Sequence, residues 1–489
     1  MVINMNVLQD LEPAKVFQFF EIIASIPHTS LHEKELSDYC VNFAKERGYY
    51  VEQDEMGNVL IVAEATPGYE KVPAIMLQGH LDMVGEKIAK CNLDLEKDGL
   101  RLYIDGDYVR AKGTTLGADD GIAVAYALTI LDDKSIPHPR LEVVFTVSEE
   151  IGLLGASAMD LSSCQARRMI NVDSEIEGIL TAGCAGGVRV CMTLPIEREK
   201  YIGMPVSFSL EGLIGGHSGM EIDKGRANAN MLLGRFLLQL SKEVEFGLVS
   251  MEGGSKENVI PKIGSVSLLL NEVDIPKSYA IMNDFTSQMS AEYGTADPGI
   301  HMIMNKDANV LHETFALNKE SLQRVITAIN MIPNGVQSMS MDLPGLVETS
   351  MNLGVVELTA DSFVMRASVR SSVPSAKEFL VNKLVYLTEF MGGTVTLAGQ
   401  YPAWPYARKS KLRDTCIKIY KQQYKKNPSI QLLHAGLECG IFADKLPGLD
   451  CISFGPNLID IHTPNEHMSI SSVARVWEFL KAVLADKTA

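Results

Sequence analysis

The sequence predicts an α/β protein, in which helices cover both faces of a mixed sheet and an α+β domain interrupts that sheet's domain. Two observations lead to this prediction. Strands and helices alternate along residues 49–150 and again after about residue 401, as they do when helices cover an at least partly parallel sheet. Between these stretches, strands alternate apolar and polar residues, the period of a half-exposed sheet. A chain of 489 residues also exceeds one ordinary hydrophobic core.

The first part of the chain justifies the α/β prediction element by element. Two amphipathic helices are expected within residues 14–48, around the break SIPHTSLHEKE. The elements expected after them, in order, are strands at 58–65 and 74–80, a helix at 121–133, a strand at 140–148, a helix at 152–161 and a strand at 167–173.

The pattern changes near Cys184–Gly187. The middle region is expected to hold strands at 186–196, 205–213, 264–273, 355–360 and 362–370, and a helix at 227–244. The alternation of helices with buried strands then returns, with a helix at 411–424 and a strand at 450–456. We therefore predict one discontinuous domain made of residues 1–186 and 402–489, and a second domain made of residues 187–401.

Composition and charge exclude several classes of function. The formal net charge of −17 disfavours nucleic-acid binding, which needs clustered Lys and Arg. No apolar run of about 18 residues indicates a membrane span, and the N-terminus lacks the pattern of a secretory signal. None of the eight cysteines forms a CxxC pair, which is typical of reduced thiols. We expect a cytoplasmic protein.

Acidic and histidine side chains follow the expected strands and helix starts at five separate junctions. They are His80 with Asp82, Asp119 with Asp120, Glu149 with Glu150, Asp173, and His462. In open α/β sheets the carboxyl ends of the strands form the ligand crevice, so these side chains are expected to meet there. Carboxylate and imidazole ligands together suit zinc, with manganese or cobalt as alternatives.

Each junction alone also has a structural explanation. A His-x-Asp pair can close off a strand, Asp119 or Asp120 can cap a helix, and Glu149–Glu150 can be a solvated turn. Asp173 can cap the next segment and His462 can anchor a loop. Five junctions of the same kind favour a common site.

The adjacent pair Glu149–Glu150 indicates hydrolytic chemistry. Neighbouring side chains point in different directions, so one can bind a metal while the other takes a proton from water. Asp119 or Asp120 is placed to bridge two metals.

The ordered set of motifs GHLDMV, GTTLGADDG, SEEIGLLGA, NVDSE, GGHSG and HTPNE resembles the dinuclear zinc exopeptidases related to aminoacylase and carnosinase. HAGLECG and GGHSGMEID narrow the resemblance to bacterial aminoacyl-histidine (Xaa-His) dipeptidases. It implies a zinc-exopeptidase fold and hydrolysis of dipeptides such as β-alanyl-histidine. An N-acyl amino-acid deacylase or a tripeptidase on the same scaffold, or a non-catalytic peptide-binding homologue, are the alternatives.

The resemblance also implies a role for each residue of the metal site. His80 and Asp173 would hold one zinc, Glu150 and His462 the other, and Asp119 would bridge both. Glu149 would be the general base, and Asp82 would orient the imidazole of His80. The peptide bond between Asp119 and Asp120 would be cis.

The middle domain resembles a lid that recognises the substrate. His217 would polarise the scissile carbonyl, Asn258 and Arg370 would hold the substrate, and Gly436 would supply a backbone contact. Glu438 and His434 are either substrate contacts or structural residues. A small peptide is the expected partner, and a homodimer through the lid is the expected assembly.

Overall fold

The computed structural model describes residues 6–306 and 310–488 and divides them into two compact units. Unit 1 comprises the described residues within 1–184, 404–432 and 437–489, and unit 2 those within 185–403 and 433–436. Unit 2 thus includes a short segment from the stretch that we predicted to be wholly in the first domain. Two backbone and side-chain contacts explain this: Ala185 N donates to Leu433 O at 2.9 Å, and Ser350 Oγ lies 2.7 Å from His434 Nε2.

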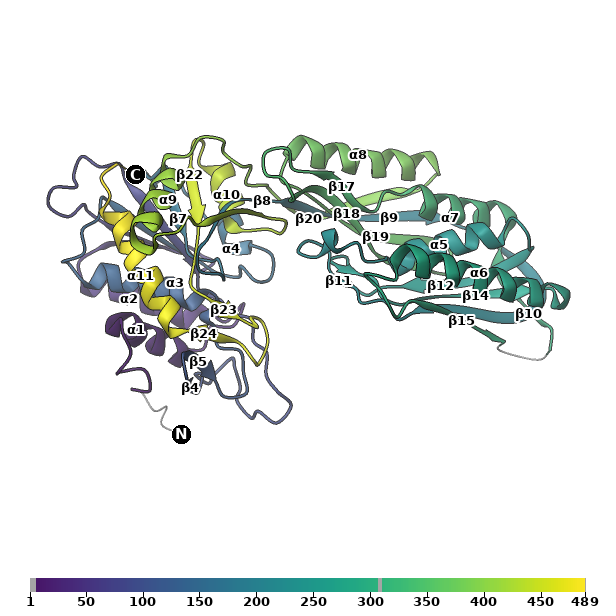
Figure 1. The fold of residues 1–489 in the computed structure, drawn as a ribbon, viewed down its shortest axis with the longest axis horizontal. Coiled ribbons are helices and arrows are strands. Elements are labelled where there is room, and N and C mark those ends of the chain that lie inside the picture. Colours follow the sequence, from purple (N-terminus) through teal and green to yellow (C-terminus); the bar gives the residue numbers. More distant parts are fainter. Residues whose placement is uncertain (1–5, 307–309, 489) are drawn as a thin grey trace. The chain divides into compact units, whose positions relative to one another are not determined.

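Unit 1 is built around a mixed sheet with helices (Figure 1). Its helices are α1 (Ala14–Ser25), α2 (Lys34–Glu46), α3 (Ala118–Asp132), α4 (Leu154–Ala158), α9 (Lys411–Tyr424), α10 (Glu438–Lys445) and α11 (Ile470–Ala485). Among the described residues its main sheet has the order β1 (Tyr50–Gln53), β2 (Val59–Ala63), β6 (Leu141–Thr146), β3 (Ile75–His80), β7 (Arg168–Asn171), β22 (Asp450–Ser453), β8 (Ile179–Cys184), β21 (Ser429–Leu433).

The four central strands of this sheet, β6, β3, β7 and β22, run parallel. Their residues are buried almost throughout, because helices or loops cover both faces. Their carboxyl ends therefore lie at one edge. A smaller sheet with the order β23 (Leu458–Ile459), β24 (His467–Ser469), β5 (Tyr108–Ala111), β4 (Leu102–Asp105) was not expected from the sequence.

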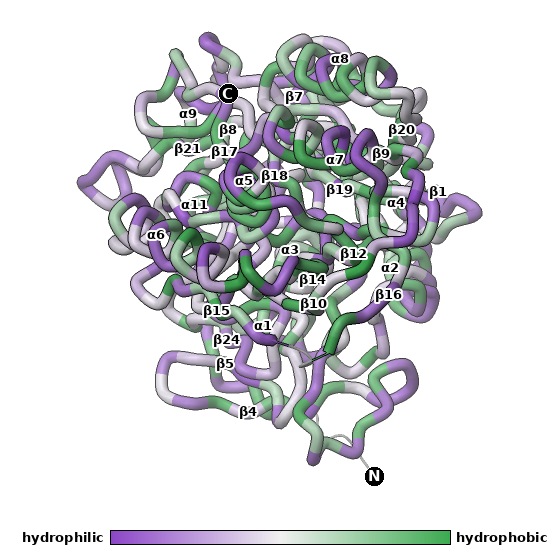
Figure 2. Tube along the Cα trace, turned by 90° about the vertical axis from the view of Figure 1, so that its right-hand side faces the viewer, coloured by the Kyte–Doolittle hydropathy of each residue, from purple (hydrophilic) through white to green (hydrophobic). Residues whose placement is uncertain are grey.

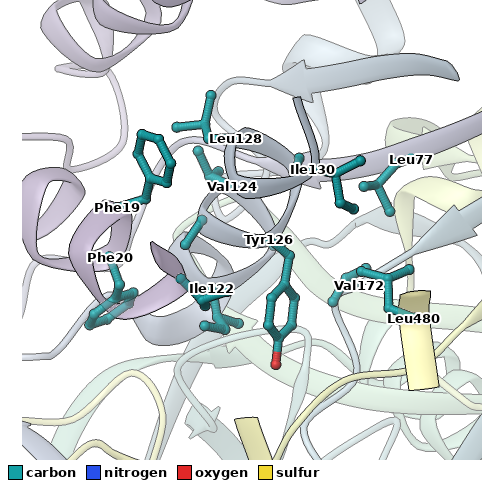
Figure 3. Close-up of a cluster of buried hydrophobic side chains, with 14 of the residues drawn as sticks. Phe19, Phe20, Leu77, Ile122, Val124, Tyr126, Leu128, Ile130, Val172 and Leu480 are labelled. Carbon is teal, nitrogen blue, oxygen red and sulfur yellow. The ribbon is translucent and has the colours of Figure 1, made fainter. Parts of the chain in front are cut away.

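Helix α3 lies at the centre of the core of unit 1 (Figure 3). Phe19 and Phe20 of α1 lie on one side of it, and Leu77 of β3 and Leu480 of α11 lie on the other. Every residue from Ala118 to Leu131 is buried, and the hydroxyl of Tyr126 donates to Val473 O at 2.8 Å. A helix that is apolar all round must be enclosed on all sides, so α3 fixes the position of the residues at its start.

Unit 2 is an α+β unit with one large sheet. Among the described residues the order of the sheet is β15 (His301–Lys306), β10 (Arg198–Glu211), β14 (Gly264–Leu270), β12 (Phe246–Gly253), β18 (Val347–Leu358), β19 (Ser362–Ser371), β9 (Gly186–Pro195), β20 (Thr394–Tyr401), with β16 (His312–Leu317) on β10 and β17 (Gly335–Met339) on β18. A two-stranded sheet pairs β11 (Gly216–His217) with β13 (Val259–Ile260). The helices are α5 (Ala229–Leu240), α6 (Ile275–Tyr293), α7 (Lys319–Met331) and α8 (Pro374–Phe390), with single 3-10 turns at Ile222–Lys224 and Glu272–Asp274.

The helices of unit 2 are amphipathic. In α8, hydrophobic and hydrophilic residues share one helix (Figure 2), and Leu380, Val381 and Leu384 are its buried apolar residues. The predicted fold class, an α/β protein with an inserted α+β region, is confirmed. In the described part of the chain no helix combines the length and apolar character needed to cross a membrane.

Candidate metal centre

The carboxylate of Asp119 lies between two imidazoles in unit 1. Its Oδ1 is 3.1 Å from Nε2 of His80, and its Oδ2 is 3.1 Å from Nε2 of His462. His80 ends strand β3, Asp119 precedes the regular part of α3, and His462 lies in the turn after β23. The Asp119–Asp120 peptide bond is cis, as the resemblance implies.

Two further carboxylates complete a group around each imidazole. Asp173, which follows β7, offers an oxygen within 4.8 Å of the ligand atoms of His80 and Asp119. Glu150, which follows β6, does the same for Asp119 and His462, and its Oε1 is 2.8 Å from His462 Nε2. All five residues that the sequence predicted as metal ligands therefore lie together, in two groups that share Asp119.

The hydrogen bonds of His80 determine its tautomer, and so which ring nitrogen faces Asp119 without a proton. Nδ1 is 2.9 Å from the carbonyl oxygen of Asp82, so it must be the donor. In the neutral ring Nε2 is then an acceptor that faces the acceptor Oδ1 of Asp119. Only a proton or a cation between these atoms makes the contact favourable. Burial opposes the charged ring, but Asp119 and Asp82 outweigh it and raise the pKa of His80 well above its ordinary value.

His462 has the same kind of environment. Burial lowers its pKa, but the carboxylates of Asp119 and Glu150 have the larger combined effect and raise the pKa to about 11. The Oδ2 atom of Asp173 is buried and has no hydrogen-bond partner in the described structure. Carboxylates this close to imidazole nitrogens, with one oxygen left unpaired, are arranged as a divalent cation requires.

The Glu149–Glu150 turn is held by a carboxylate that we predicted for another role. Asp82 accepts hydrogen bonds from the backbone N–H groups of Glu149 at 2.9 Å and Glu150 at 3.2 Å. Its Oδ1 is 3.5 Å from Nδ1 of His80, so the carboxylate also faces that ring, although the Asp82 carbonyl is closer. The hydroxyl of Ser30 donates to the same carboxylate at 2.8 Å. Asp82 thus fixes both the ring and the acidic turn.

A second buried carboxylate, that of Glu33, holds Ser148, the residue that precedes the Glu149–Glu150 turn. Its Oε1 accepts from the N–H of Ser148 at 2.8 Å and from the hydroxyl of Ser148 at 3.0 Å. Ser148 has a φ of 52°, in the left-handed region, so the turn needs such support. Sequence reasoning missed Glu33, although it lies in the break SIPHTSLHEKE between α1 and α2.

Glu149 is partly buried beside the five candidate ligands. Burial raises its pKa well above the ordinary value, and the neighbouring charges of Glu150 and Glu438 act in the same direction. A carboxylate with a raised pKa is suited to accept a proton and return it.

A row of hydrogen-bonded polar side chains crosses the sheet two residues before His80 and Asp173. Asn171 Nδ2 donates to Gln78 Oε1 at 2.7 Å, and the Gln78 amide donates to Glu438, which also accepts from Thr146 Oγ1 at 2.7 Å. Glu438 is fully buried in unit 1, and its burial raises its pKa to about 7. Gln78 is two residues before His80 and Asn171 two before Asp173, so this row supports the ligands from within each strand.

The residues predicted to recognise the substrate gather in unit 2. Arg370 is 7% exposed, has no carboxylate partner among the described residues, and donates from Nη1 to the hydroxyl of Tyr401 at 2.7 Å. Gly436 packs on the Tyr401 ring, since a Cβ there would lie 2.8 Å from it. The exposed Asn258 accepts from Ser218 N at 2.9 Å through its carbonyl oxygen.

The two histidines of this group are neutral. His217 Nδ1 accepts from the backbone N–H groups of Gly219 at 3.2 Å and Met220 at 3.1 Å, so its Nε2 carries the proton. Burial lowers the pKa of His217, and the charge of Arg370 lowers it further. Burial, Arg370 and His217 lower the pKa of His434 to about 4.

Comparison with known proteins agrees with this geometry. The model of peptidase family M20/M25/M40 matches residues 76–486, which is most of the chain. The chain belongs to this family. The prediction of a hydrolase that acts on peptide bonds is thereby confirmed.

Two relatives match this family member over nearly its full length. It is 38% identical over 489 residues to the Escherichia coli protein named cytosol non-specific dipeptidase, and the match covers 99% of each chain. It is 37% identical to the aminoacylhistidine dipeptidase of Vibrio alginolyticus, whose crystal structure has a TM-score of 0.90 and covers 98% of this chain and 97% of that chain. The resemblance drawn from the motifs is confirmed.

A third match shows the fold alone. The aminopeptidase PepT of Bacillus cereus has a TM-score of 0.55 at 16% identity and covers 97% of this chain and 98% of its own.

Proposed function

We propose that this member of the family hydrolyses dipeptides at a two-metal centre, with Xaa-His dipeptides such as β-alanyl-histidine among its substrates. The observation that carries the proposal is the Asp119 carboxylate, which offers one oxygen to the group of His80 and the other to the group of His462. The names of the two full-length relatives, a non-specific dipeptidase and an aminoacylhistidine dipeptidase, support the substrate class.

The residues present fit two zinc ions. His80 and Asp173 would hold one ion, Glu150 and His462 the other, and Asp119 both; manganese or cobalt could substitute. When bound, the ions lower the pKa of water and polarise the carbonyl that is attacked. The His80 ring is oriented for this role, because its Nδ1 donates to the Asp82 carbonyl and leaves Nε2 free as a ligand.

Glu149 is proposed as the general base. It forms a third group with His80 and Glu150, whose ligand atoms lie within 4.8 Å of one another, but it belongs to neither of the two groups that share Asp119. It would take a proton from the attacking water and later give that proton to the amine nitrogen of the leaving residue. Asp82 would keep it in place through the N–H of Glu149.

His217 is proposed as a hydrogen-bond donor to the carbonyl oxygen of the substrate. The two N–H groups that point at its Nδ1 fix the tautomer with the proton on Nε2, so the neutral ring can donate as negative charge develops. Arg370, a buried cation with no carboxylate partner in the described structure, is suited to the carboxylate at the end of a dipeptide. Asn258 and Gly436 remain proposed substrate contacts.

We further propose a cytoplasmic homodimer that pairs through residues 187–401. The name of the E. coli relative supports the location, and so do the eight cysteines, all of which are free thiols. Light scattering coupled to size-exclusion chromatography would test the assembly.

The decisive experiment is a substrate panel with the purified protein loaded with zinc, manganese or cobalt. We expect release of both amino acids from β-alanyl-histidine and other dipeptides, and little product from tripeptides or N-acetyl amino acids. Faster hydrolysis of either of the latter classes would assign a tripeptidase or a deacylase instead. A protein that binds no metal and cleaves nothing would be a peptide-binding homologue.

A further inference from the structure

Glu466 is a buried carboxylate in the motif HTPNE to which no role has been given above. Its side chain accepts three backbone hydrogen bonds from consecutive residues of a distant segment: Leu116 N at 2.7 Å and Gly117 N at 3.2 Å on Oε2, and Ala118 N at 2.9 Å on Oε1. Glu466 is 3% exposed, so water does not substitute for these bonds. Three converging N–H groups match the acceptor-only oxygens of an ionised carboxylate.

The segment that Glu466 holds ends at Asp119. Gly117 has a φ of 67°, and a Cβ at that position would lie 2.7 Å from the sulfur of Met83. The chain must therefore turn sharply in a space that admits no side chain. A backbone shift in this turn would move the Asp119 carboxylate directly, because only Ala118 separates the two.

Hydrogen bonds also link Glu466 to the turn that contains His462. Its backbone N–H donates to Thr463 O at 3.0 Å, the N–H of Asn465 donates to Thr463 Oγ1 at 3.1 Å, and Thr463 Oγ1 donates to Asp460 O at 2.7 Å. Beyond it, His467 pairs with Arg110 in the small sheet. These hydrogen bonds connect Glu466 to the turn that presents His462, which has a φ of 59°.

We propose that Glu466 is a positioning residue that sets the distance between Asp119 and His462, and so the affinity of the metal position that these two residues share with Glu150. Its carboxylate links the backbone of the Asp119 segment to the turn of His462, which are about 350 residues apart in the sequence. This inference rests on the proposed two-metal function and adds a residue that touches neither the metals nor the substrate.

The substitution Glu466→Gln tests the link with little change of volume. Glutamine keeps one acceptor oxygen and replaces the other with an NH₂ group, so at least one of the three N–H groups then faces a donor. We expect the midpoint of the zinc titration to rise by about 10- to 100-fold for one of the two ions, the range typical of residues that orient ligands. At saturating zinc, KM for a dipeptide should stay within twofold of the parent, because Glu466 contacts no proposed substrate residue.

Glu142→Gln is the matched control. Glu142 is equally buried in unit 1 and also accepts two consecutive N–H groups, from Gln165 at 2.9 Å and Ala166 at 3.0 Å. It pairs with Met76, four residues before His80 on β3, which places it about 13 Å from the ligands along the strand. The Glu142→Gln substitution should lower Tm without changing the midpoint of either zinc titration.

Zinc binding is measured by competition with a chromophoric chelator, on protein whose cooperative melting is checked first. A shifted midpoint in Glu466→Gln, a smaller shift in Glu466→Asp and none in Glu142→Gln would support the proposal. Parental zinc midpoints in a folded Glu466→Gln variant would overturn it. So would failure of both Glu466 variants to fold, because that would make Glu466 a stability residue. If the parent itself binds no zinc, the proposed function fails, and this outcome is seen before any variant is made.

Discussion

Glu33 offers the sharpest test of how the turn before the candidate base is held. Both of its hydrogen bonds, from Ser148 N and Ser148 Oγ, end on one oxygen, Oε1, and both partners are buried. Glu33→Ala would leave two buried donors unpaired, each costing about 1–3 kcal/mol, so we expect a loss of about 3–5 kcal/mol in the free energy of unfolding. Glu33→Gln keeps an oxygen at the same place and should lose only about 1–2 kcal/mol.

Urea unfolding followed by tryptophan fluorescence measures these losses in the right part of the molecule. The chain has two tryptophans, Trp404 and Trp477, and both belong to unit 1, as does Glu33. Metal-free protein removes the contribution of metal binding. Glu35→Ala is the control, because Glu35 is exposed in the first turn of α2 and should contribute only about 0.3–1 kcal/mol through the helix dipole.

The same variants test the link to catalysis. Since Ser148 precedes Glu149, Glu33→Ala should lower kcat for dipeptides more than Glu33→Gln, with a smaller change in KM. An unfolding free energy for Glu33→Ala within about 1 kcal/mol of the Glu35→Ala value would refute the reasoning, because it would mean that the Ser148 donors find other partners at no cost.

Three further predictions follow from the geometry. Glu149→Gln should lower kcat by about 10²–10⁴-fold while zinc content, measured by elemental analysis, stays at the parental value; loss of zinc would make Glu149 a ligand instead. His217→Ala should lower kcat by about 10²–10³-fold in steady-state assays, and a change confined to KM would contradict its role as a donor to the developing oxyanion. The pKa of His434, lowered to about 4 by burial, Arg370 and His217, means that the unfolded chain binds more protons than the folded chain between pH 4 and 6.5. The free energy of unfolding should therefore decrease as the pH is lowered through this range, by at most about 2 kcal/mol at pH 5 relative to pH 7. Calorimetry of His434→Gln should give a shallower pH dependence than that of the parent.

The position of the candidate ligands could be predicted because two simple regularities combine. Strands β3, β6 and β7 read as largely apolar buried strands, with His80 at the end of β3, Glu149–Glu150 after β6 and Asp173 after β7. Parallel strands end at one edge, so the order of the strands in the sheet did not need to be known. The structure brings all five predicted ligands together, including His462, which follows a strand of the small sheet that was not expected.

The predicted boundary between the two units failed at residues 433–436 for a physical reason. Segment HAGLECG reads as a loop followed by a helix, and nothing in its composition says which sheet its first residues join. The outcome depends on Ser350 bonding to His434 and on Tyr401 packing against Gly436, contacts between residues far apart in the chain. His434 and Gly436 thus lie in unit 2 while Glu438 lies in unit 1, beneath the ligands.

The residues that sequence reasoning missed share one property: each is an acid that accepts hydrogen bonds from backbone N–H groups of a distant segment. Glu33 and Glu466 read as ordinary loop acids, and in a chain with a net charge of −17 such residues are usually solvated. Here each is buried and closes a turn that contains a left-handed residue, Ser148 in one case and Gly117 in the other. Backbone donors have no sequence signature, so periodicity and motif spacing cannot reveal these contacts. The signal that was present is position: Glu33 lies in SIPHTSLHEKE, the predicted break between two helices, and Glu466 lies in the motif HTPNE. In both cases the acid holds backbone that is distant in sequence and directly precedes a site residue, Glu149 for Glu33 and Asp119 for Glu466. A loop acid in such a stretch is therefore a candidate for holding the backbone of the site as well as for binding the metal itself.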